Sequence, residues 1–426
     1  MKINSLKFNN STIHKMYHGN ELVNKIGDAF TYMEASGDTP TPPTPVPYAE
    51  QYLTFVAGAD NMSVGLTYAN RNVFQYSVDS GTTWSNLADS GSTTSVNSGQ
   101  TIMFKASGLT VTLGDGIGTL TPSVSASVQG NVMSLFYGDD FSGQTTITKN
   151  DQFRGLFYHC ANLTSAENLI LPATSLKQYC YGGMFAGCTS LTSTPVLPAT
   201  ALDNYCYRTM FDGCTSLTVT PELPSTTLAQ GCYYMMFRGC TSLTTTPELP
   251  ATTLAENCYQ YMFSGCTSLT AAPVLSATTL ASNCYYDMFQ NCTSLTTAPE
   301  LPATTLANYC YQSMFENCTS LTTAPELSAT TLADYCYQAM FRGCTNLNSI
   351  TCLATDISAT YCTRNWVSNV ATSGTFVKAA SMSNWTTGTS GIPSGWIVED
   401  KWGVDDGWDD PIGPGDDDPI WGDDQE

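Results

Sequence analysis

Positive charge is scarce in this sequence. Lysine and arginine together number 15 in 426 residues, and the formal net charge is −21 at pH 7. Proteins that hold a nucleic-acid backbone need clustered cations to neutralise phosphates, and anionic membranes make the same demand. We therefore expect no nucleic-acid partner and no attraction to an anionic membrane surface.

Histidine is scarcer still, with only His14, His18 and His159 present. The first two lie close together near the N-terminus, and the third stands beside Cys160. Ser-His-Asp and Cys-His machinery and histidine metal sites all need a histidine placed beside its partners. We predict that the protein is not an enzyme and uses no cofactor and no metal. The pair Asp139–Asp140 lacks the spacing of a dedicated calcium loop.

Long apolar runs are also missing. Polar residues interrupt the segment from Met1 to Asn10 every two or three positions, which argues against a secretory signal, and no stretch approaches a membrane span. We therefore expect no membrane insertion, and we expect the 17 cysteines to be reduced and mostly buried. Their spacing lacks the close pair of a structural zinc site, whereas disulfides between stacked copies remain geometrically conceivable.

Composition divides the chain into six segments. We predict an N-terminal docking segment (1–36), a proline-rich linker (37–47), a β-sandwich-like domain (48–130), a repeat solenoid with an entry cap (131–362), a C-terminal cap (363–398) and an acidic tail (399–426). The tail holds 12 carboxylate side chains and one lysine, so we do not expect it to fold by itself.

Two local motifs lie before the repeats. Alternating segments on either side of His18-Gly19-Asn20 predict a β-hairpin. Ser77 to Trp84 match the pattern S-x-D-x-G-x-T-W, which we interpret as a turn in which Asp79 accepts nearby backbone N–H groups.

A repeat dominates the middle of the chain. After Phe157, phenylalanine recurs at Phe185 and then every 26 residues as far as Phe341. Each unit approximates C-Y-x-x-M-F-x-G-C-T-S-L-T-x-x-P-x-L-P-A-T-T-L-A. We predict a short helix over C-Y-x-x-M-F that ends at a left-handed Gly or Asn, followed by a strand over T-S-L-T that proline terminates. Such units are stable only when stacked, and Trp366, Phe376, Trp385 and Trp396 suit a terminal cap.

The runs F-x-G-C-T-S-L-T and L-P-A-T-T-L-A resemble the BspA-type leucine-rich repeats of bacterial surface proteins and gut-phage structural proteins. The segment from Ile13 to Gly27 is similar to short N-terminal modules of virion proteins from phages of gut Bacteroidales. The resemblance implies an α+β leucine-rich-repeat solenoid of about eight units, preceded by the β-sandwich-like domain and the hairpin. It also implies recognition of host proteins, glycans or bacterial surfaces.

Comparison of the copies with one another suggests where recognition occurs. With the first Cys of each unit as position 0, positions 0, 1, 4 and 5 are constant, whereas positions −2, −1, 2, 3 and 6 vary. On a helix these sets occupy opposite faces, so the variable set is a candidate ligand-binding face. Its candidate residues are Tyr205, Arg208, Tyr234, Arg238, Tyr261, Tyr286, Asp287, Tyr335 and Arg342. Idle drift of exposed positions is the competing interpretation.

Three functions fit the sequence. The first is a virion fibre or attachment protein that is assembled in the host cytoplasm, docks to other virion proteins through residues 1–36 and contacts a host surface glycan or protein through the solenoid. The second is a bacterial cell-surface adhesin. The third is a structural capsid or tail decoration without receptor binding. We expect a homo-oligomer, for which a trimer is one candidate.

Overall fold

The computed structural model describes residues 46–67, 73–87, 91–109, 111 and 116–401, together with the backbone of two short strands near the N-terminus. The chain forms two units, Met1–Pro45 and Val46–Glu426. In the first unit, β1 (Met16–His18) and β2 (Glu21–Val23) pair antiparallel, with Tyr17 opposite Leu22. This confirms the pairing predicted for the hairpin. Most of the proline-rich linker and all but the start of the acidic tail lie outside the described residues.

The second unit begins with a β-rich region. Its strands are β3 (Leu53–Ala57), β4 (Val64–Thr67), β5 (Phe74–Ser77), β6 (Ser85–Asn86), β7 (Thr101–Ala106), β8 (Thr119–Pro122) and β9 (Ala126–Asn131). Short helices within the described part of this region are η1 (Tyr48–Glu50), α1 (Ser134–Tyr137) and η3 (Gly138–Asp140). One sheet has the order β10-β9-β3-β7-β5-β6, and β4 pairs with β8 in a second sheet. Alternate residues of β7 are buried, as expected for a strand with one face on a core.

The larger sheet continues into the repeats. Strand β10 (Leu163–Ile170) belongs to the first repeat and pairs in parallel with β9, with Leu169 opposite Gly130. The sheet therefore crosses the boundary expected near residue 130. Phe55 of β3 packs edge-on against Phe157 with ring centroids 5.9 Å apart, so the β-rich region covers the first core layer of the solenoid.

The turn predicted around Asp79 is present. Its carboxylate accepts the Thr83 backbone N–H at 2.9 Å and the Thr83 hydroxyl at 2.6 Å. These hydrogen bonds, with one from the Ser77 hydroxyl, lower the pKa of Asp79 to about 2. The motif therefore forms the local turn predicted from its residues.

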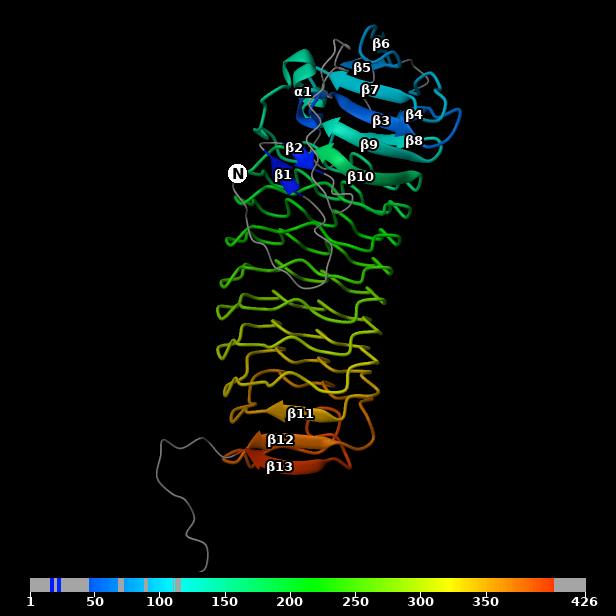
Figure 1. Ribbon diagram of the computed structural model, residues 1–426. Coiled ribbons are helices and arrows are strands. Elements are labelled where there is room, and N and C mark those ends of the chain that lie inside the picture. Colours follow the sequence, from blue (N-terminus) through cyan, green and yellow to red (C-terminus); the bar gives the residue numbers. More distant parts are fainter. Residues whose placement is uncertain are drawn as a thin grey trace, which may run out of the picture. The chain divides into compact units, whose positions relative to one another are not determined.

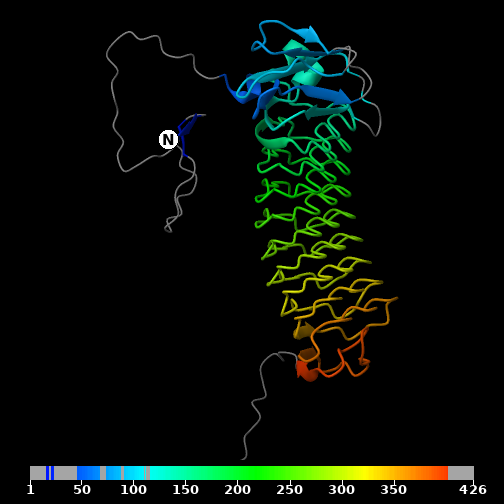
Figure 2. The same cartoon turned by 90° about the vertical axis from the view of Figure 1, so that its right-hand side faces the viewer.

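Each repeat unit forms one rung of a stack, shown in Figure 1 and, after a quarter turn, in Figure 2. The C-Y-x-x-M-F segment is not a helix, so the prediction of a helix in each repeat, and with it the α part of the α+β class, was wrong. In the rung around Cys206, alternate N–H groups donate to carbonyls three residues back, such as Arg208 to Tyr205 at 3.1 Å. The intervening N–H groups donate to the next rung, such as Tyr207 to Cys232 at 3.1 Å.

This arrangement, which we term the turn ladder, depends on left-handed backbone conformations. In the same rung φ is 55° at Tyr205, 54° at Thr209 and 71° at Gly213. A left-handed conformation costs a non-glycine residue about 1–2 kcal/mol. The ladder compensates because every second N–H gains a partner in the neighbouring rung, whereas a helix would satisfy its N–H groups within one rung only. The positive φ predicted for the Gly or Asn at the end of the segment is confirmed.

The strand predicted after each turn ladder is mostly reduced to single bridges between rungs, such as Ala271 with Thr297. Continuous strands occur at the C-terminal end, where β11 (Ser349–Cys352), β12 (Thr375–Ala379) and β13 (Ile397–Lys401) form a parallel sheet. Strand β13 includes the first three residues of the segment expected to be an acidic tail.

The core consists of columns of identical side chains. Phenylalanines stack from rung to rung, with centroids 5.6 Å apart for Phe211 and Phe237, and tyrosines stack likewise, with 5.9 Å between Tyr207 and Tyr233. All cysteines are buried, which confirms that expectation. The cysteines three residues after the repeat phenylalanine form a column of their own. From Cys188 to Cys344 each of these thiols donates to a phenylalanine carbonyl of the preceding rung, as Cys240 does to Phe211 at 3.1 Å.

Tryptophans close the C-terminal end of this core. Trp366 is fully buried and lies against both Tyr337 and Phe341, with centroids 6.3 Å away in each case. Trp385 stacks on its other side at 5.6 Å. One indole thus covers the ends of two aromatic columns, which is the role expected of a terminal cap.

Candidate binding face

Each turn ladder has one side that faces the core and one side that faces outward. Side chains at positions 0, 1, 4 and 5 point into the core, as the buried Cys206, Tyr207, Met210 and Phe211 illustrate. Positions −1, 2, 3 and 6 of successive rungs form columns on the outer side, which we term the ladder face. Most of the variable side chains there are partly exposed, whereas some at positions 3 and 6, such as Ser313 and Glu316, are buried. The variable residues therefore lie on one side of the rungs, although a turn ladder rather than a helix creates it.

Tyrosines gather at the end of the ladder face nearest the β-rich region. Tyr179 and Tyr205 stack in parallel with centroids 5.1 Å apart. The Tyr205 ring extends over Gly231, where an added Cβ would approach ring atoms to 2.2 Å. The Arg208 guanidinium lies 6.0 Å from the Tyr205 ring and 5.2 Å from that of Tyr234. Tyr205, Arg208 and Tyr234, all predicted site residues, are thus brought together.

A second aromatic group lies farther along the face. Tyr234, Tyr261 and Tyr286 follow one another edge-to-face, with centroid separations of 6.1 and 5.3 Å. All three are half-buried. Burial raises the pKa of Tyr261 and of Tyr286, with nearby Asp287 adding to the effect, so both are neutral hydroxyl groups at ordinary pH.

Asp287 differs from the other candidates because its side chain is buried, with 2% of the residue exposed. Burial raises the pKa of this carboxyl to about 7, although the Tyr261 and Tyr286 hydroxyls partly oppose the shift. Its Oδ1 atom has no hydrogen-bond partner within the described part of the chain. Asp287 therefore lies beneath the aromatic group rather than on the surface.

Two predicted arginines form ion pairs between rungs. Arg238 donates to both Asp212 carboxylate oxygens, at 2.9 and 2.6 Å, and Arg342 pairs with Glu316. Both guanidinium groups remain partly exposed, with side-chain exposures of 43% and 48%. Tyr335, in the same rung as Arg342, stacks on Tyr309 of the preceding rung with centroids 4.5 Å apart.

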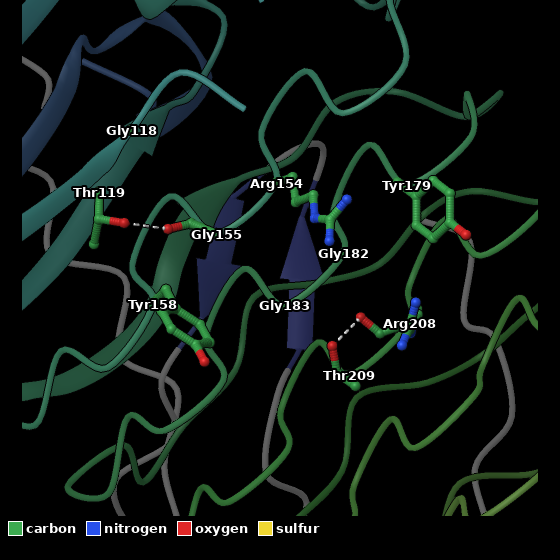
Figure 3. A pocket seen from close by; sticks show the side chains of 10 residues that line it. All are labelled: Gly118, Thr119, Arg154, Gly155, Tyr158, Tyr179, Gly182, Gly183, Arg208 and Thr209. Carbon is green, nitrogen blue, oxygen red and sulfur yellow. Dashed lines mark hydrogen bonds between the residues drawn. The ribbon is translucent and has the colours of Figure 1, made fainter. Parts of the chain in front are cut away.

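Sequence reasoning missed a hollow at the end of the ladder face nearest the β-rich region, which we call its upper end. It has a volume of about 350 Å3 and is lined by Gly118, Thr119, Arg154, Gly155, Tyr158, Tyr179, Gly182, Gly183, Arg208 and Thr209. Figure 3 shows the Arg154, Tyr179, Arg208 and Tyr158 side chains around the two adjacent glycines. The sequence signal for this hollow was the pair Gly182-Gly183, because no other copy of the repeat has glycine at both position 2 and position 3.

Among the residues that the structure describes, no three His, Cys, Asp or Glu side chains gather in a set that could hold a metal ion. Asp139, one of the acidic pair weighed for calcium, bonds to the Lys105 ammonium at 2.7 Å and to the Tyr52 hydroxyl at 2.7 Å. No helix in the described part of the chain is long and apolar enough to cross a membrane.

Comparison with protein families agrees with the rung pattern. Residues 184–321 and 284–370 match the BspA type leucine rich repeat region, a model of six copies. Over this part of the sequence, which is somewhat less than half of the chain, the protein is similar to BspA-type leucine-rich repeats. The match covers the rungs that carry the tyrosines and arginines of the ladder face from Tyr205 onward, and repeats of this type suggest a surface or adhesin-like protein. No curated protein and no solved structure matches the chain.

Proposed function

We propose that the protein is a non-enzymatic attachment protein that recognises a bacterial surface glycan or protein through its ladder face. The observation that carries this proposal is the set of tyrosines partly exposed in columns outside the core. Packing does not require them, because a separate column that includes Tyr207 and Tyr233 fills the interior. Columns of accessible aromatic rings carry an association risk, and tyrosine and arginine are the residues most enriched where binding energy concentrates.

The proposed setting is a virion fibre. Residues 1–36 would dock to other virion proteins, and the β-rich region with its solenoid would contact the host. The separation of strands β1 and β2 into a unit distinct from Val46–Glu426 supports this division. The similarity of the opening sequence to short virion modules, which we expect from its residues, motivates the proposal. Removal of residues 1–36 should leave a folded chain that binds cells but no longer enters particles. A chain found attached to the bacterial surface would instead indicate an adhesin.

Substitution of three ladder-face tyrosines tests recognition directly. Tyr234→Gln, Tyr261→Ser and Tyr286→Gln each introduce a residue that other rungs carry at the same position, namely Gln260 and Ser313, so the backbone should be preserved. We expect at least about tenfold weaker binding of the fluorescently labelled chain to host cells, because tyrosines at binding hot spots contribute about 2 kcal/mol or more each.

The control is a triple variant that removes exposed apolar side chains outside the turn ladders. Val196, Val219 and Val274 are 74%, 56% and 78% exposed and lie in the segment after the ladder. Their replacement by serine should leave cell binding unchanged. Equal binding by both triple variants would refute recognition through the ladder face and favour a structural decoration protein.

A further inference from the structure

The hollow at the upper end of the ladder face exists because one rung lacks side chains there. Gly182 and Gly183 occupy the positions that hold Arg208 and Thr209 in the next rung. Position 6 of the same rung is also small, Ala186, and its Cβ lies 4.0 Å from a Cβ added at Gly183. The floor of the hollow is therefore the backbone of Gly182 and Gly183, and the hollow spans the width of a single rung.

Its walls come from the glycine-bearing rung itself, from the rungs on either side, and from Gly118 and Thr119 of the β-rich region. Arg154 and Tyr158 belong to the preceding rung, Arg208 and Thr209 to the following one, and Tyr179 closes one side. The Thr209 hydroxyl donates to the Arg208 carbonyl at 2.7 Å, which fixes that wall, and Figure 3 shows this bond at the edge of the glycine floor. The result is an open recess with aromatic rings and guanidinium groups at its rim.

Positive charge is concentrated here in an otherwise acidic protein. Arg154 lies over the Tyr179 ring at 5.2 Å and pairs with Asp151 at 3.0 Å, so part of its charge is compensated. Arg208 is held between aromatic rings, and within the described part of the chain it forms no ion pair. Of the other ladder-face arginines, Arg238 and Arg342 each have a carboxylate partner, and Arg364 lies in the last rung, far along the chain from the hollow. Arg208 is therefore the guanidinium at the hollow that is best placed to receive an anion from solution.

We propose that this hollow binds the carboxylate-bearing ring of an acidic carbohydrate. A guanidinium fork matches a carboxylate with two parallel hydrogen bonds, and tyrosine rings provide flat surfaces for the C–H face of a sugar together with hydroxyl groups for hydrogen bonding. The volume lies at the lower end of the range for small-molecule sites, which suits one sugar ring with its chain continuing into solvent. This assignment rests on the proposed function and specifies the ligand of its ladder face.

Paired sugars test the assignment on the full chain. Each acidic sugar is compared with a neutral partner by ligand-observed NMR titration. The methyl glycosides of glucuronic acid and galacturonic acid are paired with those of glucose and galactose, and the methyl glycoside of N-acetylneuraminic acid is paired with its methyl ester. We expect at least one acidic sugar to bind about tenfold or more tightly than its neutral partner, because the charge-assisted hydrogen bonds are lost with the carboxylate.

Three variants locate the binding. Gly182→Gln fills the floor with the side chain that Gln260 and Gln312 supply at the same position, so the fold should be kept. Arg208→Gln removes the free guanidinium. Both should weaken acidic-sugar binding at least about tenfold. Arg364→Gln is the matched control, since Arg364 holds the same position in the last rung and stacks on Tyr361 at 4.9 Å; it should bind as the wild type does.

The inference is overturned if no acidic sugar is preferred to its neutral partner, if Arg364→Gln weakens binding as much as Arg208→Gln, or if a short peptide with a free C-terminal carboxylate binds more tightly than the sugars. Host-cell binding measured in parallel separates this result from the proposed function. Cells bound without any acidic preference would refute the hollow's ligand alone, whereas a wild-type chain that binds no cells would refute recognition itself.

Discussion

Replacement of the buried Asp287 by asparagine should stabilise the protein at neutral and alkaline pH. The carboxyl lies among Tyr261, Tyr286, Glu316 and Arg342, and burial is the main cause that raises its pKa from 3.8 to about 7. Asparagine has nearly the same shape and carries no charge. The substitution therefore removes the cost of ionising a buried carboxyl and leaves the packing in place.

The sign and size of the effect follow from proton linkage. Because the folded protein holds this proton more tightly than the unfolded chain, the free energy of unfolding falls as pH rises from about 4 to about 7, and the full penalty persists above that range. A shift of about three pKa units corresponds to roughly 4 kcal/mol as an upper bound. The advantage of Asp287→Asn should be near zero at pH 4 and reach its plateau by pH 8.

Urea unfolding of both proteins at several pH values between 4 and 8.5 measures this difference. Exposed Glu300→Gln serves as a control for the loss of one carboxylate from an acidic protein, and it should show no comparable gain. An advantage of Asp287→Asn that is the same at every pH, or that shrinks as pH rises, would refute the assignment of a raised pKa to a buried, poorly partnered carboxyl.

Substitutions at three further positions probe the stacked rungs by chemical denaturation. Gly213→Asn should cost less than about 1 kcal/mol because Asn291 adopts a φ of 61° at the equivalent position, whereas Gly213→Val should cost about 2 kcal/mol or more; similar costs for both would contradict the strain argument. Phe263→Ala should cost about 3–5 kcal/mol because it opens a gap in the phenylalanine column, and a cost below about 1 kcal/mol would mean that the column is not packed. Arg238→Gln should cost under about 1 kcal/mol, since its ion pair with Asp212 is solvent-accessible, and the cost should decline as salt is added.

The repeat period and the buried residues were predictable from the sequence, but the backbone that presents them was not. Apolar pairs such as Cys206-Tyr207 and Met210-Phe211 recur at intervals of four, which a helix and a turn ladder both bury on one side. The distinguishing evidence is subtler: positions −1, 3 and 7 often hold Gly, Asn or Asp, residues that tolerate a left-handed backbone. Rungs with tyrosine there hide this signal, because the stack supplies the energy that overrides local preference.

The candidate site shows the same division. Variation between copies correctly placed Tyr205 and Tyr234 on one surface, because side-chain direction follows from the periodicity. It could not show that Asp287 is buried or that Arg238 is paired with Asp212, since both depend on neighbours 26 residues away in the chain. The hollow over Gly182 could not be predicted from the sequence either, because its walls come from three rungs and the β-rich region.

Thiol accessibility tests the central claim, that the constant side chains of every rung are enclosed in a continuous core. All 17 cysteines are buried free thiols, and burial raises the pKa of those in the central rungs, such as Cys240 and Cys258, so both exposure and reactivity are suppressed. After reduction and desalting, the folded chain should react with an aromatic disulfide reagent at no more than about one thiol within minutes, and in guanidinium chloride at all 17. Rapid reaction of many thiols in the folded protein would contradict the stacked-rung core and the recognition surface built on it.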